Sequence, residues 1–213
     1  MNYSTAEKTI VLADGVFPVN EIPFEMLSEA GFIVCCDGAV EKLVAHGFEP
    51  DMIVGDLDSL SREMKTRYET ILSFDPDQET NDLTKAVKWC VSHGRKDIVI
   101  LGATGLREDH TLGNISLITE YSKIATVKMV TDYGILEVHR EKVTIDSWPG
   151  QQVSIFSINS STVVTSHGLE YPLLDLLLDN WWKGTLNQAQ GDSFTLDFTG
   201  GPLIIFRLFK DKR

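Results

Sequence analysis

The chain has 213 residues, enough for one large domain or two small ones, and its hydrophobic content of 43% is typical of a globular protein. Its formal net charge of −12 argues against nonspecific binding to nucleic acid or to an anionic membrane, since both need a positive surface. No apolar stretch approaches the roughly 20 residues of a membrane span, so we expect neither nucleic acid nor membrane as a partner.

Strand and helix patterns alternate through the first part of the chain. Apolar runs predict strands at residues 9–12, 32–36, 52–54, 71–74, 98–101 and 126–130. The segments between them predict helices at residues 24–30, 40–45, 61–68 and 109–121. The clearest helix starts near Asn81, because five apolar residues recur on one face: Leu83, Ala86, Val87, Cys90 and Val91. This alternation predicts a parallel sheet covered by helices on both faces.

The pattern changes past about Tyr133. Residues 153–158 and 194–198 alternate apolar and polar positions, and a turn at residues 199–202 leads into another apolar run. These features favour antiparallel strands and hairpins. Only residues 173–179 suggest one short helical turn. We therefore predict an α/β domain at residues 1–134, followed by a smaller β domain at residues 135–213.

Most polar residues with chemical potential fall just after a predicted strand. They are Asp37 and Gly38 after the second strand, Asp56 and Asp58 after the third, Asp75, Asp77, Gln78 and Asp82 after the fourth, and Arg107, Asp109 and His110 after the fifth. In a parallel sheet these four places share one edge, where open α/β sheets bind their ligands.

This set of side chains suits a metal-bound nucleotide. Mg²⁺ takes oxygen ligands, usually one or two carboxylates together with substrate phosphates, and Asp56, Asp58 and Asp82 supply such groups. Arg107 and Lys85 could meet the remaining phosphate oxygens, and small residues such as Gly105 would let the backbone approach them. Taken singly, each feature has an ordinary structural interpretation, such as a turn at Asp56, a first-turn helix charge at Asp82, or a core or interface role for Trp181 and Trp182.

The three cysteines, Cys35, Cys36 and Cys90, form neither a disulfide framework nor a zinc-binding CxxC spacing. The first two lie in an apolar run, which predicts buried thiols and fits a reducing compartment. Residues 1–8 are polar and lack the apolar core of a signal peptide. We therefore expect a cytoplasmic location.

Four motifs in order resemble the thiamine pyrophosphokinase (thiamine diphosphokinase) family. They are Cys36-Asp37-Gly38-Ala39, the Gly-Asp-Leu-Asp-Ser stretch at residues 55–59, the Gln-x-x-Asn-Asp stretch at residues 78–82, and the Arg-x-Asp-His-x-x-x-Asn block at residues 107–114. A fifth stretch, Gly184-Thr185-Leu186-Asn187, is similar to the family's carboxyl-terminal Gly-Thr-Ser-Asn loop. The resemblance spans most of the chain.

The resemblance implies transfer of pyrophosphate from ATP to thiamine, giving thiamine diphosphate and AMP, by a Mg²⁺-dependent homodimer. It implies a Rossmann-like amino-terminal domain for ATP and metal and a carboxyl-terminal β-sandwich for thiamine. By the same resemblance, Asp56, Asp58 and Asp82 would be metal ligands and, with Arg107 and Asp109, catalytic. The implied nucleotide-binding positions are Asp37, Gly38, Gln78, Lys85, Gly105, Arg107 and His110. The implied thiamine site contains Thr185, Leu186, Asn187 and, as a stacking surface, Trp182.

Three positions depart from the family pattern: Asn81 stands where Thr is usual, Leu106 where a second Gly is common, and Leu186 where the loop has Ser. Two other interpretations stay open. An apolar strand followed by Asp-x-Asp also suits a phosphatase of the haloacid dehalogenase type, in which the first Asp is a nucleophile. The chain could also be a noncatalytic thiamine- or nucleotide-binding module.

Overall fold

The structure is a computed structural model that describes residues 8–210. The chain divides into two compact units, Met1–Asp132 and Tyr133–Arg213, each considered separately below. Most of the polar start on which the expected location partly rests, residues 1–7, lies outside the described residues.

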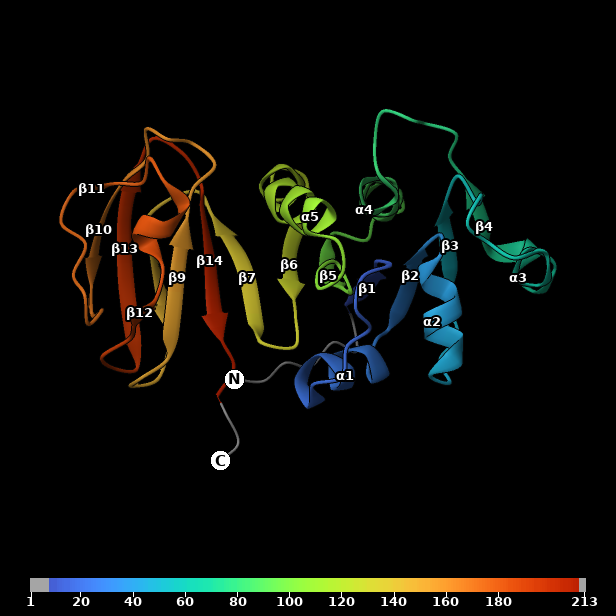
Figure 1. Ribbon diagram of the computed structural model, residues 1–213, viewed down its shortest axis with the longest axis horizontal. Helices are drawn as coiled ribbons and strands as arrows, with labels where there is room; N and C mark the ends of the chain where they lie inside the picture. Colours follow the sequence, from blue (N-terminus) through green and yellow to red (C-terminus); the bar gives the residue numbers. More distant parts are fainter. Residues whose placement is uncertain (1–7, 211–213) are drawn as a thin grey trace. The chain divides into compact units, whose positions relative to one another are not determined.

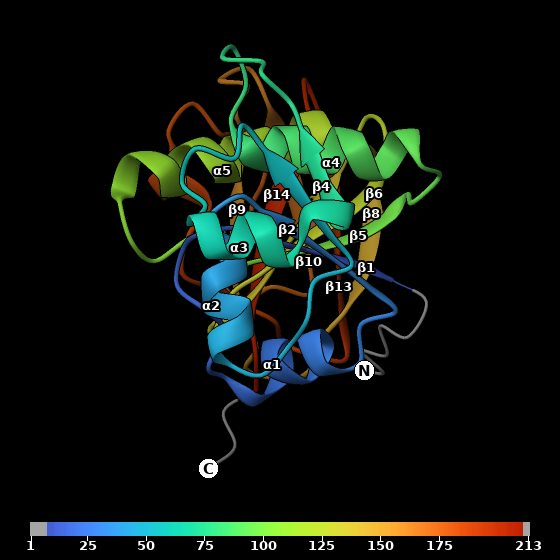
Figure 2. The same cartoon turned by 90° about the vertical axis from the view of Figure 1, so that its right-hand side faces the viewer.

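The first unit contains a sheet of six parallel strands. Its strands are β1 (Thr9–Leu12), β2 (Phe32–Cys36), β3 (Met52–Gly55), β4 (Leu72–Phe74), β5 (Asp97–Leu101) and β6 (Thr126–Val130). They lie in the order β6-β5-β1-β2-β3-β4 with parallel pairing throughout. Strand order reverses at β1, so the segments that leave the carboxyl ends of the neighbouring strands β1 and β5 lead to helices on opposite faces of the sheet (Figures 1 and 2). The crevice between such segments is the usual ligand position in these sheets.

Helices cover both faces of this sheet, as predicted. They are α1 (Glu21–Ser28), α2 (Ala39–Ala45), α3 (Arg62–Arg67), α4 (Asp82–Ser92) and α5 (Glu108–Tyr121), with a short 3₁₀ helix, η1 (Glu69–Ile71), before β4. Figures 1 and 2 show α4 and α5 on one side of the sheet and α1 and α2 on the other. The central strands are therefore buried on both faces, which explains their continuous apolar sequences.

Capping residues fix the ends of these helices. The side chain of Ser61 accepts a hydrogen bond from Met64 N, as expected for the start of α3. The predicted start of the first helix at residue 24 is wrong by three residues. Asn20 caps α1 by accepting a hydrogen bond from Ile22 N, and Pro23 lies in the first turn, where its missing N–H costs nothing.

The second unit is a sandwich of two antiparallel sheets, so the predicted fold class is confirmed. One sheet has the order β12-β9-β14-β7 and the other β11-β10-β13-β8. The strands are β7 (Gly134–His139), β8 (Val143–Asp146), β9 (Gln152–Phe156), β10 (Val163–His167), β11 (Leu176–Leu177), β12 (Asn187–Gln188), β13 (Ser193–Thr199) and β14 (Leu203–Leu208).

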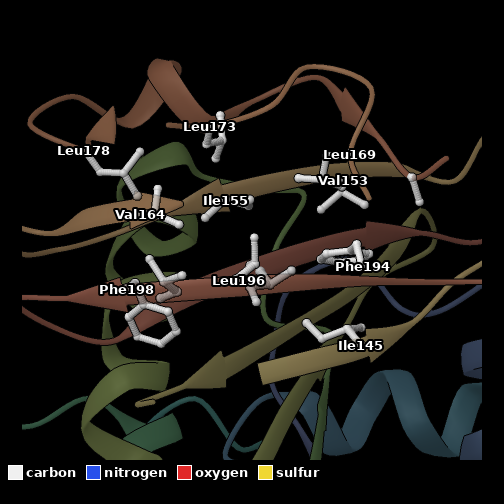
Figure 3. Close-up of a cluster of buried hydrophobic side chains, with 13 residues drawn as sticks. Ile145, Val153, Ile155, Val164, Leu169, Leu173, Leu178, Phe194, Leu196 and Phe198 are labelled. Carbon is white, nitrogen blue, oxygen red and sulfur yellow. The ribbon is translucent and has the colours of Figure 1, made fainter. Parts of the chain in front are cut away.

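Alternating side chains from both sheets build the core of this unit (Figure 3). Phe194, Leu196 and Phe198 of β13 face inward, against Val153 and Ile155 of β9. The intervening residues of β13 are less buried, which gives the period-two pattern seen in the sequence.

The helical turn suggested at residues 173–179 is wrong. Leu176 and Leu177 pair as β11 with Val164 and Val163 of β10. Asp175 has a left-handed backbone (φ 48°), which is incompatible with a helix, and its N–H donates to Thr165 Oγ1 at 3.1 Å. Among the described residues, no helix is long and apolar enough to cross a membrane.

Candidate active site

A cavity of about 360 Å³ opens at the carboxyl ends of β1, β2 and β5. Its walls come from the loops that follow these strands and β3, from the start of α4 and from the first two turns of α5. The lining residues are Ala13, Asp14, Gly15, Cys36, Asp37, Gly38, Ser59, Asn81, Asp82, Leu83, Ala103, Thr104, Leu106, Arg107, His110, Thr111 and Asn114. Five of the predicted site residues are in this list: Asp37, Gly38, Asp82, Arg107 and His110.

A cluster of three carboxylates stands beside this cavity. One oxygen from each of Asp37, Asp56 and Asp58 lies within 4.8 Å of the other two. Asp37 is 2% exposed and contributes the buried end of the cluster, whereas Asp58 is exposed. The family resemblance implies a metal-ligand role for Asp56 and Asp58 but only a nucleotide-binding role for Asp37.

The members of this cluster differ in their electrostatic environment. Burial raises the pKa of Asp37, and the nearby charges of Asp82, Asp56 and Asp58 raise it further, against a hydrogen bond from Ser59 N. The pKa of Asp56 is lowered, first by the hydrogen bond from Asp58 N and also by Gln78. The buried carboxylate therefore resists ionisation, while its neighbour ionises easily.

A fourth carboxylate, Asp82, lies near this cluster, and Lys85 contacts both Asp82 and Asp56. The buried ammonium of Lys85 is 3.0 Å from Asp82 Oδ1 and 3.8 Å from Asp56 Oδ2. Burial disfavours the charged lysine, but the hydrogen bond and charge of Asp82 and the charge of Asp56 outweigh it, so the pKa of Lys85 is raised. Asp82 occupies the first turn of α4, off the buried stripe, as the sequence predicted.

Gly55 allows this crowding of acidic groups at the end of β3. A Cβ added there would lie 2.9 Å from Asp37 Cβ and 3.2 Å from Asp82 Oδ1. A side chain at this position would therefore push both carboxylates away. The next residue but one, Leu57, has a left-handed backbone (φ 62°) and links Asp56 to Asp58 by a sharp turn.

The loop before α5 presents an exposed ion pair. Arg107 Nη2 donates to Asp109 Oδ2 at 2.5 Å and Arg107 Nε donates to Asp109 Oδ1 at 3.1 Å. The pair holds the pKa of Asp109 below its ordinary value. His110 is exposed and follows directly, at the cavity wall. Gly105, in contrast, packs beside Val16 with φ 91° and is not among the lining residues.

Sequence reasoning missed several residues of this cavity, most clearly Asp14. It follows β1 just as Asp37 follows β2, so the rule of polar residues after parallel strands could have found it. Lys42 of α2 fixes this loop: its Nζ is 2.7 Å from Asp14 Oδ1 and donates to the carbonyl oxygens of Asp14 and Gly15 at 2.8 Å. Asn81 and Asn114 also line the cavity, although the sequence analysis gave neither a role.

In the second unit, the predicted thiamine residues lie in and directly after the 3₁₀ helix η2 (Trp181–Gly184): Trp182 belongs to it, and Thr185, Leu186 and Asn187 follow it. A Cβ at Gly184 would meet Ile155 O at 2.2 Å, so only glycine allows this approach to β9. Trp182 is 71% exposed and Leu186 is 80% exposed, the latter with a left-handed backbone (φ 58°). Core burial, one of the interpretations offered for Trp182, is therefore wrong.

Two polar residues of this loop are engaged within it. Asn187 is buried; its Oδ1 accepts from Tyr171 N at 3.1 Å and its Nδ2 donates to Tyr171 O at 2.7 Å. Thr185 Oγ1 donates to Trp182 O at 2.7 Å. These bonds hold residues 171 and 182–187 in place, which leaves the exposed Trp182 and Leu186 as the presented surface.

The residues of the first unit fit a hard divalent cation. Asp37 Oδ1 is buried and has no hydrogen-bond partner within the described chain. Four neighbouring carboxylates, Asp37, Asp56, Asp58 and Asp82, are accompanied by the ammonium of Lys85. Such an excess of negative charge needs a cation or protons, and carboxylate oxygens are the ligands that Mg²⁺ prefers.

Comparisons with known proteins agree with this geometry. Residues 24–131 match the family model "Thiamin pyrophosphokinase, catalytic domain". Residues 134–206 match "Thiamin pyrophosphokinase, substrate-binding domain". Thiamin pyrophosphokinase 1 of Caenorhabditis elegans is 29% identical over 167 residues, which cover 71% of this chain and 68% of the relative. Thiamine pyrophosphokinase 1 of Oryza sativa subsp. japonica is 29% identical over 170 residues, 66% of this chain and 64% of the relative.

Solved structures agree in fold. Thiamin pyrophosphokinase from Candida albicans superposes with a TM-score of 0.81 at 17% identity, covering 98% of this chain and 92% of that chain. Thiamin pyrophosphokinase from Geobacillus thermodenitrificans gives a TM-score of 0.76 at 24% identity, covering 96% and 98%. Together the two family models span most of both units, and the chain therefore belongs to the thiamin pyrophosphokinase family.

Proposed function

We propose that this protein is an enzyme that transfers pyrophosphate from ATP to thiamine, giving thiamine diphosphate and AMP. The thiamine hydroxyl oxygen forms a bond to the β-phosphorus of ATP. The bond between that phosphorus and the oxygen bridging to the α-phosphorus breaks, and AMP leaves with the bridging oxygen. The hydroxyl proton goes to a base that we do not assign. The observation that carries this proposal is the convergence of Asp37, Asp56 and Asp58 beside a cavity in the first unit, which matches the family's catalytic domain.

Asp56, Asp58 and Asp82 are the proposed Mg²⁺ ligands, to which the structure leads us to add Asp37. When bound, the metal would neutralise charge on the phosphate oxygens. Lys85 offsets the charge of Asp82 and Asp56, and we propose that it also contacts a phosphate oxygen. Gln78 holds Asp56 through its side-chain amide.

Arg107 and Asp109 are proposed to act on the nucleotide from the other wall. The guanidinium has a planar set of donors that fits phosphate oxygens, and Asp109 holds it at the mouth of the cavity. Asp37, Gly38 and His110 line the same space, and Gly105 shapes the loop that leads to Arg107. Positioning of the triphosphate by these groups would supply much of the rate.

The second unit is proposed to bind thiamine. Trp182 offers an exposed aromatic face, on which a cationic thiazolium ring would be attracted by the ring quadrupole. Leu186 adds apolar contact, while Thr185 and Asn187 hold the loop through backbone contacts. The functional division we propose follows the predicted domains, residues 1–134 for ATP and metal and residues 135–213 for thiamine.

Two further properties are part of the proposal. A homodimer is supported by the family resemblance and by exposed apolar side chains in the second unit, among them Tyr171 and Leu174. A cytoplasmic location is supported by three cysteines that are free and buried: Cys35, Cys36 and Cys90.

A product assay tests this function. The purified protein is incubated with ATP, with and without thiamine and Mg²⁺, and AMP and thiamine diphosphate are quantified. We expect equal amounts of both products, formed only when thiamine and Mg²⁺ are present. Release of inorganic phosphate without AMP would contradict the proposal.

The other two interpretations make different predictions in the same assay. A haloacid-dehalogenase-type phosphatase would form a trappable phospho-aspartate at Asp56 and release phosphate. A noncatalytic module would bind thiamine and a nonhydrolysable ATP analogue in calorimetry without turnover. The family assignment does not favour either of them.

A further inference from the structure

A continuous chain of side-chain hydrogen bonds joins α4, α5 and the loop after β5. Tyr121 and Thr84 hydroxyls lie 2.7 Å apart, and Thr84 Oγ1 donates to Asn81 Oδ1 at 2.7 Å. Asn81 Nδ2 donates to Asn114 Oδ1 at 3.1 Å. Asn114 Nδ2 donates to the carbonyl of Ala103 at 2.8 Å. This series of hydrogen bonds runs from the buried Tyr121 to the wall of the cavity.

The direction of this chain is fixed at both ends. Asn81 Oδ1 also accepts from Thr84 N at 2.9 Å, and a backbone N–H can only donate. The carbonyl of Ala103 can only accept, so Asn114 must present its amide nitrogen there. Since Thr84 has one hydroxyl proton and gives it to Asn81, Tyr121 must donate to Thr84. Neither amide can therefore be turned over without breaking a bond.

These hydrogen bonds connect α4 and α5, the two helices whose amino ends carry proposed ATP and metal residues. Asn81 is the N-cap of α4, whose first residues include Asp82 and Lys85. Asn114 belongs to α5, whose first turn carries His110 and whose N-cap is Arg107. The Asn81–Asn114 bond is the link of this chain that crosses between the helices at the cavity itself.

We propose that Asn81 and Asn114 are positioning residues that fix the separation of the α4 and α5 amino ends, so that Asp82 and Lys85 face the same triphosphate as Arg107 and His110. This proposal rests on the proposed function. It gives a role to Asn81, a position that departs from the family pattern. Threonine can cap a helix but has no amide nitrogen to donate across to Asn114.

The test uses Asn81→Thr, which keeps a capping oxygen but removes the crossing donor, and Asn114→Leu, which removes the crossing acceptor at similar size. We measure kcat, the KM for ATP and the Mg²⁺ concentration that gives half-maximal turnover. We expect kcat/KM for ATP to fall by about 10- to 100-fold in each variant and the Mg²⁺ requirement to rise, because small displacements of positioned groups cost rates of this order. The KM for thiamine is expected to stay unchanged.

Two tyrosine variants provide the matched control. Tyr121→Phe removes the hydroxyl at the far end of the chain and is expected to give a smaller effect of the same kind. Tyr68→Phe removes a hydroxyl that donates to Glu49 Oε2 at 2.6 Å, outside the chain of bonds, and is expected to leave the ATP and Mg²⁺ parameters unchanged.

Loss of thermal stability in Asn81→Thr and Asn114→Leu without a change in KM for ATP or Mg²⁺ requirement would overturn the positioning role. If the wild-type protein makes no thiamine diphosphate, the proposed function fails on its own. The positioning role is then tested by calorimetry with Mg²⁺ and a nonhydrolysable ATP analogue. Weaker analogue binding by both variants supports it, and equal binding contradicts it.

Discussion

The two units present their candidate ligand-binding residues in different ways. In the first unit, charged side chains come from loops after separate parallel strands, and the sheet brings them together at one edge. In the second unit, the candidate residues belong to one continuous segment, residues 171–187, in which Trp182 is 71% exposed and Leu186 is 80% exposed. Charges gathered from many loops suit a metal and a triphosphate, whereas an exposed aromatic and apolar loop suits an organic ring.

Both regions use a leucine in the left-handed backbone region. Leu57 (φ 62°) sits between two carboxylates and is partly buried, whereas Leu186 (φ 58°) is 80% exposed. The strain therefore serves different ends in the two places. At Leu57 the turn lies between two carboxylates that cluster with Asp37, and at Leu186 it leaves an apolar side chain exposed in the proposed thiamine loop.

The largest expected effect comes from the carboxylate cluster. Asp58→Asn should lower turnover by more than about 100-fold while the protein keeps its fold, because it removes a proposed metal ligand. The AMP-release assay measures turnover, and circular dichroism checks the fold. Asp197→Asn is the control, since Asp197 lies in the second unit and pairs with Lys142 at the surface. Near-normal turnover of Asp58→Asn would contradict the proposed metal site.

A smaller effect is expected in the second unit. Trp182→Ala should raise the KM for thiamine about 10-fold, because cation–π contact with a desolvated ligand is worth on the order of 1–2 kcal/mol. The KM for ATP should not change, which would separate the roles of the two units. Trp182→Phe keeps an aromatic face and should recover part of the loss. An equal rise of the KM for thiamine and the KM for ATP would contradict the proposed assignment of thiamine to the second unit and ATP to the first.

Replacing Lys85 tests whether its ammonium stabilises the fold when no metal ion offsets the charge of the acidic cluster. Lys85→Met should lower the free energy of unfolding in Mg²⁺-free buffer by about 1–3 kcal/mol, because Asp82 and Asp56 lose their buried counter-charge. Urea denaturation measures this, and added Mg²⁺ should restore part of the loss. Lys88→Met, on the exposed side of the same helix, should be nearly neutral. A neutral Lys85→Met would show that the cluster needs no counter-charge.

The last prediction concerns the pH dependence of stability in the first unit. Burial raises the pKa of Tyr121 to about 12 and, with a hydrogen bond to Glu49, that of Tyr68 to about 12, and both lie in the first unit. A folded pKa above the ordinary value of 10.0 means that their stabilising contribution is complete below pH 10 and is lost as pH rises from 10 through 12. Urea unfolding should show a loss of up to about 1 kcal/mol per pH unit for each tyrosine.

Tyr121→Phe and Tyr68→Phe should each reduce the steepness of this loss. Tyrosinate absorbance of the folded protein provides an independent check. If all tyrosines of the folded protein ionise near pH 10, burial does not protect these two, and the pH argument fails.

Much of the first unit followed from the sequence because its signals are local. Apolar runs predicted all six parallel strands, and Ser61 and Asn81 marked two helix starts correctly. The first helix begins earlier than predicted: Asn20 is its N-cap, and Pro23, which often marks a break, lies in its first turn, where proline is tolerated. Asp37 was assigned only to the nucleotide because its burial beside Asp56 and Asp58 depends on contacts among three loops, which local patterns do not reveal.

The second unit was less predictable for a physical reason. Some of its strands take partners from distant parts of the chain, as β8 does with β13. Leu176 and Leu177 form a strand of only two residues, paired with β10, which is too short to show the alternation typical of a strand. The exposure of Trp182 likewise depends on Gly184 lying against β9. The carboxamide pair of Asn81 and Asn114 went unnoticed because 33 residues separate its members.

The carboxylates of the first unit are proposed to hold the metal and the triphosphate independently of thiamine. Calorimetric titration of the wild-type protein and Asp58→Asn with a nonhydrolysable ATP analogue, with and without Mg²⁺, tests it directly. We predict that the wild type binds the analogue only with Mg²⁺ and without any need for thiamine, and that Asp58→Asn loses this metal-dependent binding. Equal binding by both proteins, or binding that ignores Mg²⁺, would contradict the claim.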